Sequence, residues 1–117
     1  MKKRLRLTRQ RDFQRILGGA AAYRSSTLVC FGLVGSRNGL QVGVAASRQI
    51  KGSVSRNRAK RRLREAVRIG VAVPRQNLLS SSHQVVLIAR AAALERPFEQ
   101  LVRDAAQAFA RIAPEGR

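Results

Sequence analysis

The sequence predicts a small α+β domain in which helices cover a central sheet. Three observations lead to this prediction. Apolar residues repeat with the 3.6-residue spacing of amphipathic helices in three separate segments. Short runs rich in β-branched residues, which are typical of strands, lie between these segments. The chain has 117 residues, of which 44% are hydrophobic, and this is enough for one folded core.

The first half of the chain predicts one helix and two strands. Phe13, Ile16 and Leu17 share one face of a helix that begins near Thr8 and stops at Gly18. A run at 27–34 is apolar on both alternating faces, which predicts a strand covered on both sides.

The residues after this strand contain a turn signal. Asn38-Gly39 is typical of hairpins, although the connection 35–39 is longer than a two-residue turn. We therefore expect 40–46 to return as the strand that pairs with 27–34.

The second half predicts a helix, a strand and a last helix. After a loop at 47–55, a helix begins at about 53 or 55 and ends at about 71. A polar connection at 74–82 leads to a buried strand at 85–89. The last helix begins at Pro97 and presents an apolar face as far as 112. The element order is therefore α-β-β-α-β-α.

The domain organisation follows from these elements. Residues 8–112 form a single domain without repeats or internal linkers. Residues 1–7 are expected to be a basic, flexible N-terminal arm, and residues 113–117 a short tail.

The net charge predicts a polyanionic partner. Twenty-four Lys and Arg residues against six Asp and Glu give a formal charge of +18. Such an excess causes self-repulsion in the folded state, and nucleic acid is the polyanion that most often offsets it. An acidic membrane surface would instead require an amphipathic helix with a bulky apolar face or a lipid anchor, and neither is found at the termini.

The cellular location is expected to be the cytoplasm. The basic start of the chain is not followed by the apolar run of a signal peptide, and no stretch approaches the roughly 20 apolar residues of a membrane span. The single cysteine, Cys30, lies in an apolar run and is expected to be buried. It has no partner for an internal disulfide, which fits a reducing compartment.

The segment from 55 to 68 is the most informative for function, because seven of its fourteen residues are Arg or Lys. On a helix, its apolar residues form one stripe for the core, and its basic residues cover the remaining surface. Arg side chains grip phosphate with two parallel hydrogen bonds, so this surface is expected to bind RNA. The candidate contacts are Arg56, Asn57, Arg58, Lys60, Arg61, Arg62, Arg64 and Arg68. Glu65 is expected to pair with Arg61 or Arg62 within the helix.

Four sequence blocks resemble the bacterial ribonuclease P protein family. The motif Arg56-Asn57-Arg58, followed by Lys60, Arg61 and Arg64, is similar to the signature of the family. The blocks 7–17, 42–48 and 85–90 resemble its opening helix, its glycine-containing strand and its last strand, in the same order. The likeness covers about residues 5 to 110.

The resemblance implies a more specific fold and function. The fold would be a two-layer α/β sandwich with a central mixed sheet and a left-handed β-α-β crossover, like domain 2 of ribosomal protein S5. The protein would be the subunit of ribonuclease P that binds the catalytic RNA, and the assembly would remove the 5′ leader from precursor tRNA. The resemblance assigns the chemistry to the RNA and its Mg²⁺ ions, so no catalytic residue, metal site or small-molecule substrate is expected on the protein.

The family also holds the single-stranded leader in a cleft between the first helix and the sheet. The positions that match this cleft or lie beside it are Phe13, Tyr23, Phe31 and Arg48, and we expect Arg9 and Arg11 to contact the RNA backbone. Aromatic stacking over a basic groove is a common way to hold single-stranded RNA, although the aromatic residues also suit ordinary core packing. Leu17 departs from the family, because many members have a second aromatic residue there.

Three other functions agree less well with the sequence. A ribosomal or other structural RNA-binding protein would explain the charge but not the four ordered blocks. A protein nuclease would need clustered acids or a nucleophile with its base, whereas the six acids are scattered and His83 is the only histidine. A DNA-binding factor would be expected to carry a helix-turn-helix pair or zinc ligands, and neither is found.

Overall fold

Four strands form one mixed sheet in the computed structural model, which describes residues 16–19, 21–34, 41–72 and 83–112. The strands are β1 (Tyr23–Arg24), β2 (Leu28–Val34), β3 (Gln41–Ala46) and β4 (His83–Ala89). Their order across the sheet is β1-β2-β4-β3. β4 is antiparallel to β2 and parallel to β3. The predicted arm and tail lie outside the described residues.

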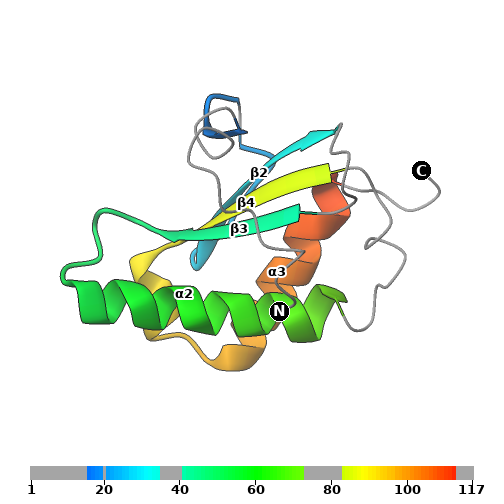
Figure 1. The fold of residues 1–117 in the computed structure, drawn as a ribbon. Coiled ribbons are helices and arrows are strands. Elements are labelled where there is room, and N and C mark those ends of the chain that lie inside the picture. The colour runs from blue at the N-terminus through cyan, green and yellow to red at the C-terminus, as the bar shows by residue number, and fades with distance from the viewer. Residues whose placement is uncertain (1–15, 20, 35–40, 73–82, 113–117) are drawn as a thin grey trace.

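The helices form a second layer on one face of the sheet (Figure 1). They are α2 (Ser53–Val67) and α3 (Phe98–Ile112). A π-helical segment, η2 (Arg68–Ala72), continues α2, and a short 3₁₀ segment, η4 (Ala91–Leu94), precedes α3. The α+β class and the mixed sheet expected from the sequence are therefore confirmed. The left-handedness of the β3-α2-β4 crossover remains a prediction.

The predicted pairing of 27–34 with 40–46 is wrong. β2 and β3 both pair with β4, which lies between them. Val85, Val86 and Leu87 of β4 are completely buried, so this strand has apolar side chains for both faces and suits the centre of the sheet. The parallel pairing of β3 with β4 requires a crossover of a dozen or more residues, which α2 supplies. The Asn38-Gly39 turn signal concerns only its own neighbourhood in the sequence and does not indicate which strand lies beside β2 or β3.

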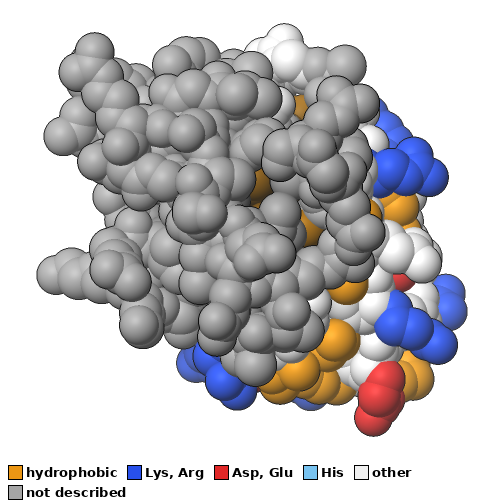
Figure 2. Space-filling model, turned by 90° about the vertical axis from the view of Figure 1, so that its right-hand side faces the viewer, with side chains coloured by type: hydrophobic (Ala, Val, Ile, Leu, Met, Phe, Trp, Pro, Cys, Tyr) orange, Lys and Arg blue, Asp and Glu red, His pale blue; other side chains and the backbone are white. Residues whose placement is uncertain are grey.

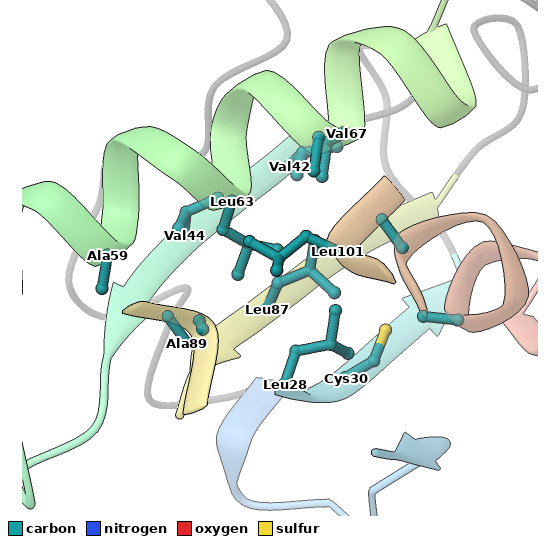
Figure 3. Close-up of a cluster of buried hydrophobic side chains, with 14 of the residues drawn as sticks. Leu28, Cys30, Val42, Val44, Ala59, Leu63, Val67, Leu87, Ala89 and Leu101 are labelled. Atoms are coloured by element: carbon teal, nitrogen blue, oxygen red, sulfur yellow. The ribbon is translucent and has the colours of Figure 1, made fainter. Parts of the chain in front are cut away.

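The main core lies between the sheet and the two helices (Figure 3). Ala59 and Leu63 of α2 are completely buried and point toward the sheet, as the apolar stripe in the sequence predicts. Leu87 of β4 and Leu101 of α3 meet them in this layer. Burial of this stripe determines which side of α2 faces outward.

A smaller cluster covers the opposite face of the sheet. Ile16 and Val86 are buried there, with Leu17, Phe31 and Ile88 packed against them. Ile16 and Leu17 are helical and lie across the sheet from α2 and α3, in blue in Figure 1. The rest of the helix expected from Thr8 lies outside the described residues.

The helical chain ends close to the predicted position, but its last turn is not α-helical. The α-helix stops at Val67, and the chain then continues in π-helical form as far as Ala72. A Cβ added to Gly70 would stand 2.8 Å from the carbonyl oxygen of Val102 in α3. The two backbones therefore approach so closely that only glycine fits, and the sequence pattern did not predict this contact.

Candidate nucleic-acid interface

The basic segment forms α2, which begins after Gly52. Gly52 has a φ of 85°, in the left-handed region that glycine tolerates best. No side chain caps the helix at this residue, and the first turn contains no acidic residue. The positive end of the helix dipole is therefore not offset by an acid within its own first turn.

Four of the eight candidate contacts form an outward surface, which we call the basic face: Asn57, Arg58, Lys60 and Arg61. The side chains of Asn57, Arg58 and Arg61 are exposed, and that of Lys60 is half-buried. Within the described part of the chain, no acid or carbonyl group pairs with these four side chains. No group in the described part of the chain occupies their hydrogen-bond donors.

Three other candidates contact the protein itself. The Nε of Arg56 donates to the carbonyl of Ile50 at 2.9 Å. A terminal nitrogen of Arg62 donates to the carbonyl of Arg96 at 2.7 Å. The Nε of Arg68 donates to Glu65 at 2.9 Å. Arg64, the eighth candidate, is half-buried on α2.

The predicted partner of Glu65 is therefore wrong, because Glu65 pairs with Arg68 and not with Arg61 or Arg62. Glu65 precedes Arg68 by three residues, so the two side chains are neighbours on the helix surface. The hydrogen bond from Arg68 lowers the pKa of Glu65. This pairing leaves Arg61 exposed without an acidic partner among the described residues.

The residues expected to line a leader cleft lie in several places. Phe31 is half-buried on the face of the sheet opposite α2 and α3, against Ile16 and Val86. Arg48 is exposed just beyond the end of β3. Phe13, Arg9 and Arg11 lie outside the described residues.

Tyr23 lies on the other face of the sheet from Phe31. It pairs directly with Cys30 across β1 and β2, and both pack with the core beneath α3. The hydroxyl of Tyr23 donates to Gln107 at 2.8 Å, and the Arg111 guanidinium lies 5.7 Å from its ring centre. Desolvation, with the charge of Asp104, raises the pKa of Tyr23. The structure therefore does not bring Tyr23 and Phe31 together.

Sequence reasoning missed one basic residue on the Phe31 face. Arg24 is exposed and pairs with Val29, which shares a face with Phe31 because the two are separated by one residue in β2. The alternation of side chains between the two faces of a strand is the signal that could have identified Arg24. It was missed because β1 has only two residues and has no pattern of its own.

Two further properties of the described residues bear on function. They contain no group of three or more His, Cys, Asp or Glu side chains that could hold a metal ion. No helix among them combines the length and the apolar character needed to cross a membrane. On the face drawn in Figure 2, the described Lys and Arg side chains stand in separate places, with few acidic side chains among them.

Sequence comparisons identify relatives of the chain. The family model described as Ribonuclease P matches residues 1–113. A ribonuclease P protein component of Chloroflexus aurantiacus is 35% identical over 104 residues, which cover 89% of this chain and 74% of that protein. One from Symbiobacterium thermophilum is 46% identical over 71 residues, which cover 61% of this chain and 57% of that protein.

Solved structures show the same fold. The ribonuclease P protein of Thermotoga maritima superimposes with a TM-score of 0.72 at 20% identity, covering 92% of this chain and 97% of that one. The protein from Staphylococcus aureus gives a TM-score of 0.67 at 20% identity, covering 90% of this chain and 92% of that one. The architecture described above is therefore also that of experimentally determined proteins.

Proposed function

Because this chain belongs to the ribonuclease P protein family, and is thus a protein subunit of that ribonucleoprotein endoribonuclease, we propose that the basic face of α2 binds the catalytic RNA. One observation carries this assignment. The side chains of Asn57, Arg58, Lys60 and Arg61 project from one helix and have no acidic partner among the described residues, whereas Arg56, Arg62 and Arg68 bond to the protein.

The chemistry of these side chains supports phosphate as their ligand. A guanidinium group offers two parallel donors that match the oxygens of a phosphate, and a carboxamide can also accept from a ribose hydroxyl. Each phosphate neutralised by a basic side chain releases counterions, which makes the interaction dependent on salt. Arg58 and Arg61 lie three residues apart on α2 and can reach phosphates on the same side of the helix.

We further propose that the face of the sheet around Phe31 holds the single-stranded leader of a precursor tRNA. Phe31 offers an aromatic surface, and the exposed Arg24 and Arg48 offer charges for the backbone of the leader. Phe13, Arg9 and Arg11 remain candidates on the basis of the sequence. Tyr23 packs beneath α3, so we leave it out of this leader surface.

The proposal assigns the cleavage chemistry to the RNA with its Mg²⁺ ions, as the family resemblance implies. The role of the protein is to bind and position the two RNA molecules. The assembly is proposed to act in the cytoplasm, where precursor tRNA is processed.

The experiment that tests the basic face measures binding of a ribonuclease P RNA at several salt concentrations. Arg58→Met and Arg61→Met should each weaken binding about 10- to 100-fold and reduce the log–log salt slope by about 1. The matched control is Arg103→Met, which removes an exposed charge from α3 and should change neither quantity appreciably. Equal effects of all three variants would overturn the assignment, because only net charge would then matter.

A further inference from the structure

Arg62 differs from the other basic residues of α2, because its side chain is held by the segment between η4 and α3. A terminal nitrogen donates to the carbonyl of Arg96 at 2.7 Å. The guanidinium carbon lies 6.0 Å from the ring centre of Phe98, within cation–π range. Its Nε is buried and has no hydrogen-bond partner. Arg62 is therefore directed at the protein, whereas the adjacent Arg61 is exposed.

The segment that Arg62 contacts is itself well defined. The amide of Arg96 donates to Ala92 at 2.9 Å, so this part of the chain is folded onto η4. Phe98 begins α3 and packs against the main core. Arg62 thus joins the polar flank of α2 to Arg96 and Phe98, which are held in place by η4 and α3.

We propose that Arg62 is a positioning residue that restricts the rotation of α2 about its own axis more tightly than the buried stripe does alone, and so holds the basic face toward RNA without contacting RNA itself. Two of the four buried side chains of α2, Ala59 and Ala66, are alanines, which offer less packing surface against rotation than large side chains do. A contact on the flank of the helix restricts that rotation. This inference rests on the proposed function, because it presumes that the basic face is the surface that binds RNA.

The planar guanidinium is essential to this role. It can lie over the Phe98 ring and donate to the Arg96 carbonyl at once, whereas a lysine ammonium is a compact charge without a planar face. If the whole guanidinium turned toward a phosphate, Arg62 would lose the hydrogen bond to Arg96 and its contact with the Phe98 ring. Lysine at position 62 would keep the charge and lose the positioning contact.

The test compares Arg62→Lys with Arg61→Lys in binding of ribonuclease P RNA, at a temperature where circular dichroism shows each variant fully folded. Arg62→Lys should weaken binding about three- to tenfold with an unchanged salt slope, and by more than Arg61→Lys does. Phe98→Leu, which changes no charge, should weaken binding to a similar extent. Phe98→Tyr keeps the ring and should retain the affinity of the parent protein.

The double variant Arg62→Lys/Phe98→Leu should bind RNA no more weakly than whichever single variant binds RNA more weakly. The reason is that both substitutions remove the same contact, the one between Arg62 and Phe98. The inference is overturned if Arg62→Lys matches Arg61→Lys, or if its effect adds fully to that of Phe98→Leu. Should Arg62→Lys fail to fold, the comparison of Phe98→Leu with Phe98→Tyr decides, and equal affinities overturn the inference. Failure of the proposed function would give a different result from failure of this inference. Arg58→Met and Arg61→Met would then bind ribonuclease P RNA as tightly as Arg103→Met does.

Discussion

The hydroxyl of Thr27 donates a 2.6 Å hydrogen bond to the carboxylate of Asp104, and this bond joins the turn before β2 to α3. Thr27 is completely buried, although it is polar. Ser25 donates to the same carboxylate oxygen at 3.2 Å. A hydrogen bond from a hydroxyl to a carboxylate is stronger than one between two neutral groups. The Thr27–Asp104 bond therefore anchors α3 at the β1–β2 turn.

Thr27→Val should therefore lower the free energy of unfolding by about 1.5–3 kcal/mol, because the isosteric change removes a hydrogen bond to a charged group. Urea denaturation measures this. Ser26→Ala is the matched control, because Ser26 is exposed in the same turn and its hydroxyl accepts a hydrogen bond from the exposed Gln100 side chain at 3.1 Å. Equal losses in the two variants would contradict the special role of the Thr27–Asp104 bond.

Gly70→Ala should destabilise the protein by about 1–3 kcal/mol, because the new methyl group would push η2 away from the Val102 backbone. The sign of this change distinguishes a close contact from an open one, because replacing glycine by alanine at a compatible position stabilises the folded protein by about 0.4–1 kcal/mol. Thermal unfolding measures the change. In the control Gly19→Ala, the nearest added contact is 3.6 Å, an ordinary distance, and no comparable loss is expected. A stabilised Gly70→Ala variant would show that the approach to α3 is looser than described.

The thiol of Cys30 should react with thiol reagents only when the protein unfolds. Burial raises its pKa to about 12, from an ordinary value of 9.0, so the nucleophilic thiolate is scarce at neutral pH. The unfolded state loses this proton above about pH 9 while the folded state keeps it, so stability should fall as the pH rises from there toward 12. Labelling rates measured with and without urea test this. Rapid labelling of the folded protein would contradict the burial of Cys30.

The Glu65 carboxyl should titrate below its ordinary pKa of 4.5, because Arg68 donates hydrogen bonds to its ionised form. A depressed pKa stabilises the fold above the ordinary value, and this contribution is lost as the pH falls through the lowered pKa. The pair is exposed, so the effect on stability should be small. Carbon-13 NMR of the carboxyl measures the midpoint, which Arg68→Met should raise. An unchanged midpoint in that variant would show that the pair does not persist in solution.

Local sequence patterns predicted the elements of the fold better than their partners. The apolar stripe of α2 was clear because Ala59 and Leu63 repeat at helical spacing. The neighbours of β4 in the sheet could not be predicted from local patterns, because strand pairing depends on contacts between segments far apart in the sequence. Asn38-Gly39 favoured a local hairpin, whereas the buried β4 separates β2 from β3. β1 and η4 are too short to have a recognisable period.

The same distinction holds for the candidate site. Sequence identified α2 as the basic helix, and its outward residues follow from the position of the buried stripe. It did not separate Arg61, which is exposed, from Arg62, which is held by Arg96 and Phe98. That separation depends on where η4 and α3 lie. The opposite placement of Tyr23 and Phe31 likewise depends on the register between β1 and β2.

Reconstitution of the ribonucleoprotein is the decisive test of the proposed function. The purified protein is mixed with a bacterial ribonuclease P RNA and a 5′-extended precursor tRNA at a low Mg²⁺ concentration, with each component omitted in turn. We expect cleavage at the mature 5′ end that requires both RNA and protein, and that is reduced by Arg61→Met but not by Arg103→Met. RNA binding without any gain in cleavage would contradict the proposed function and favour a structural RNA-binding protein.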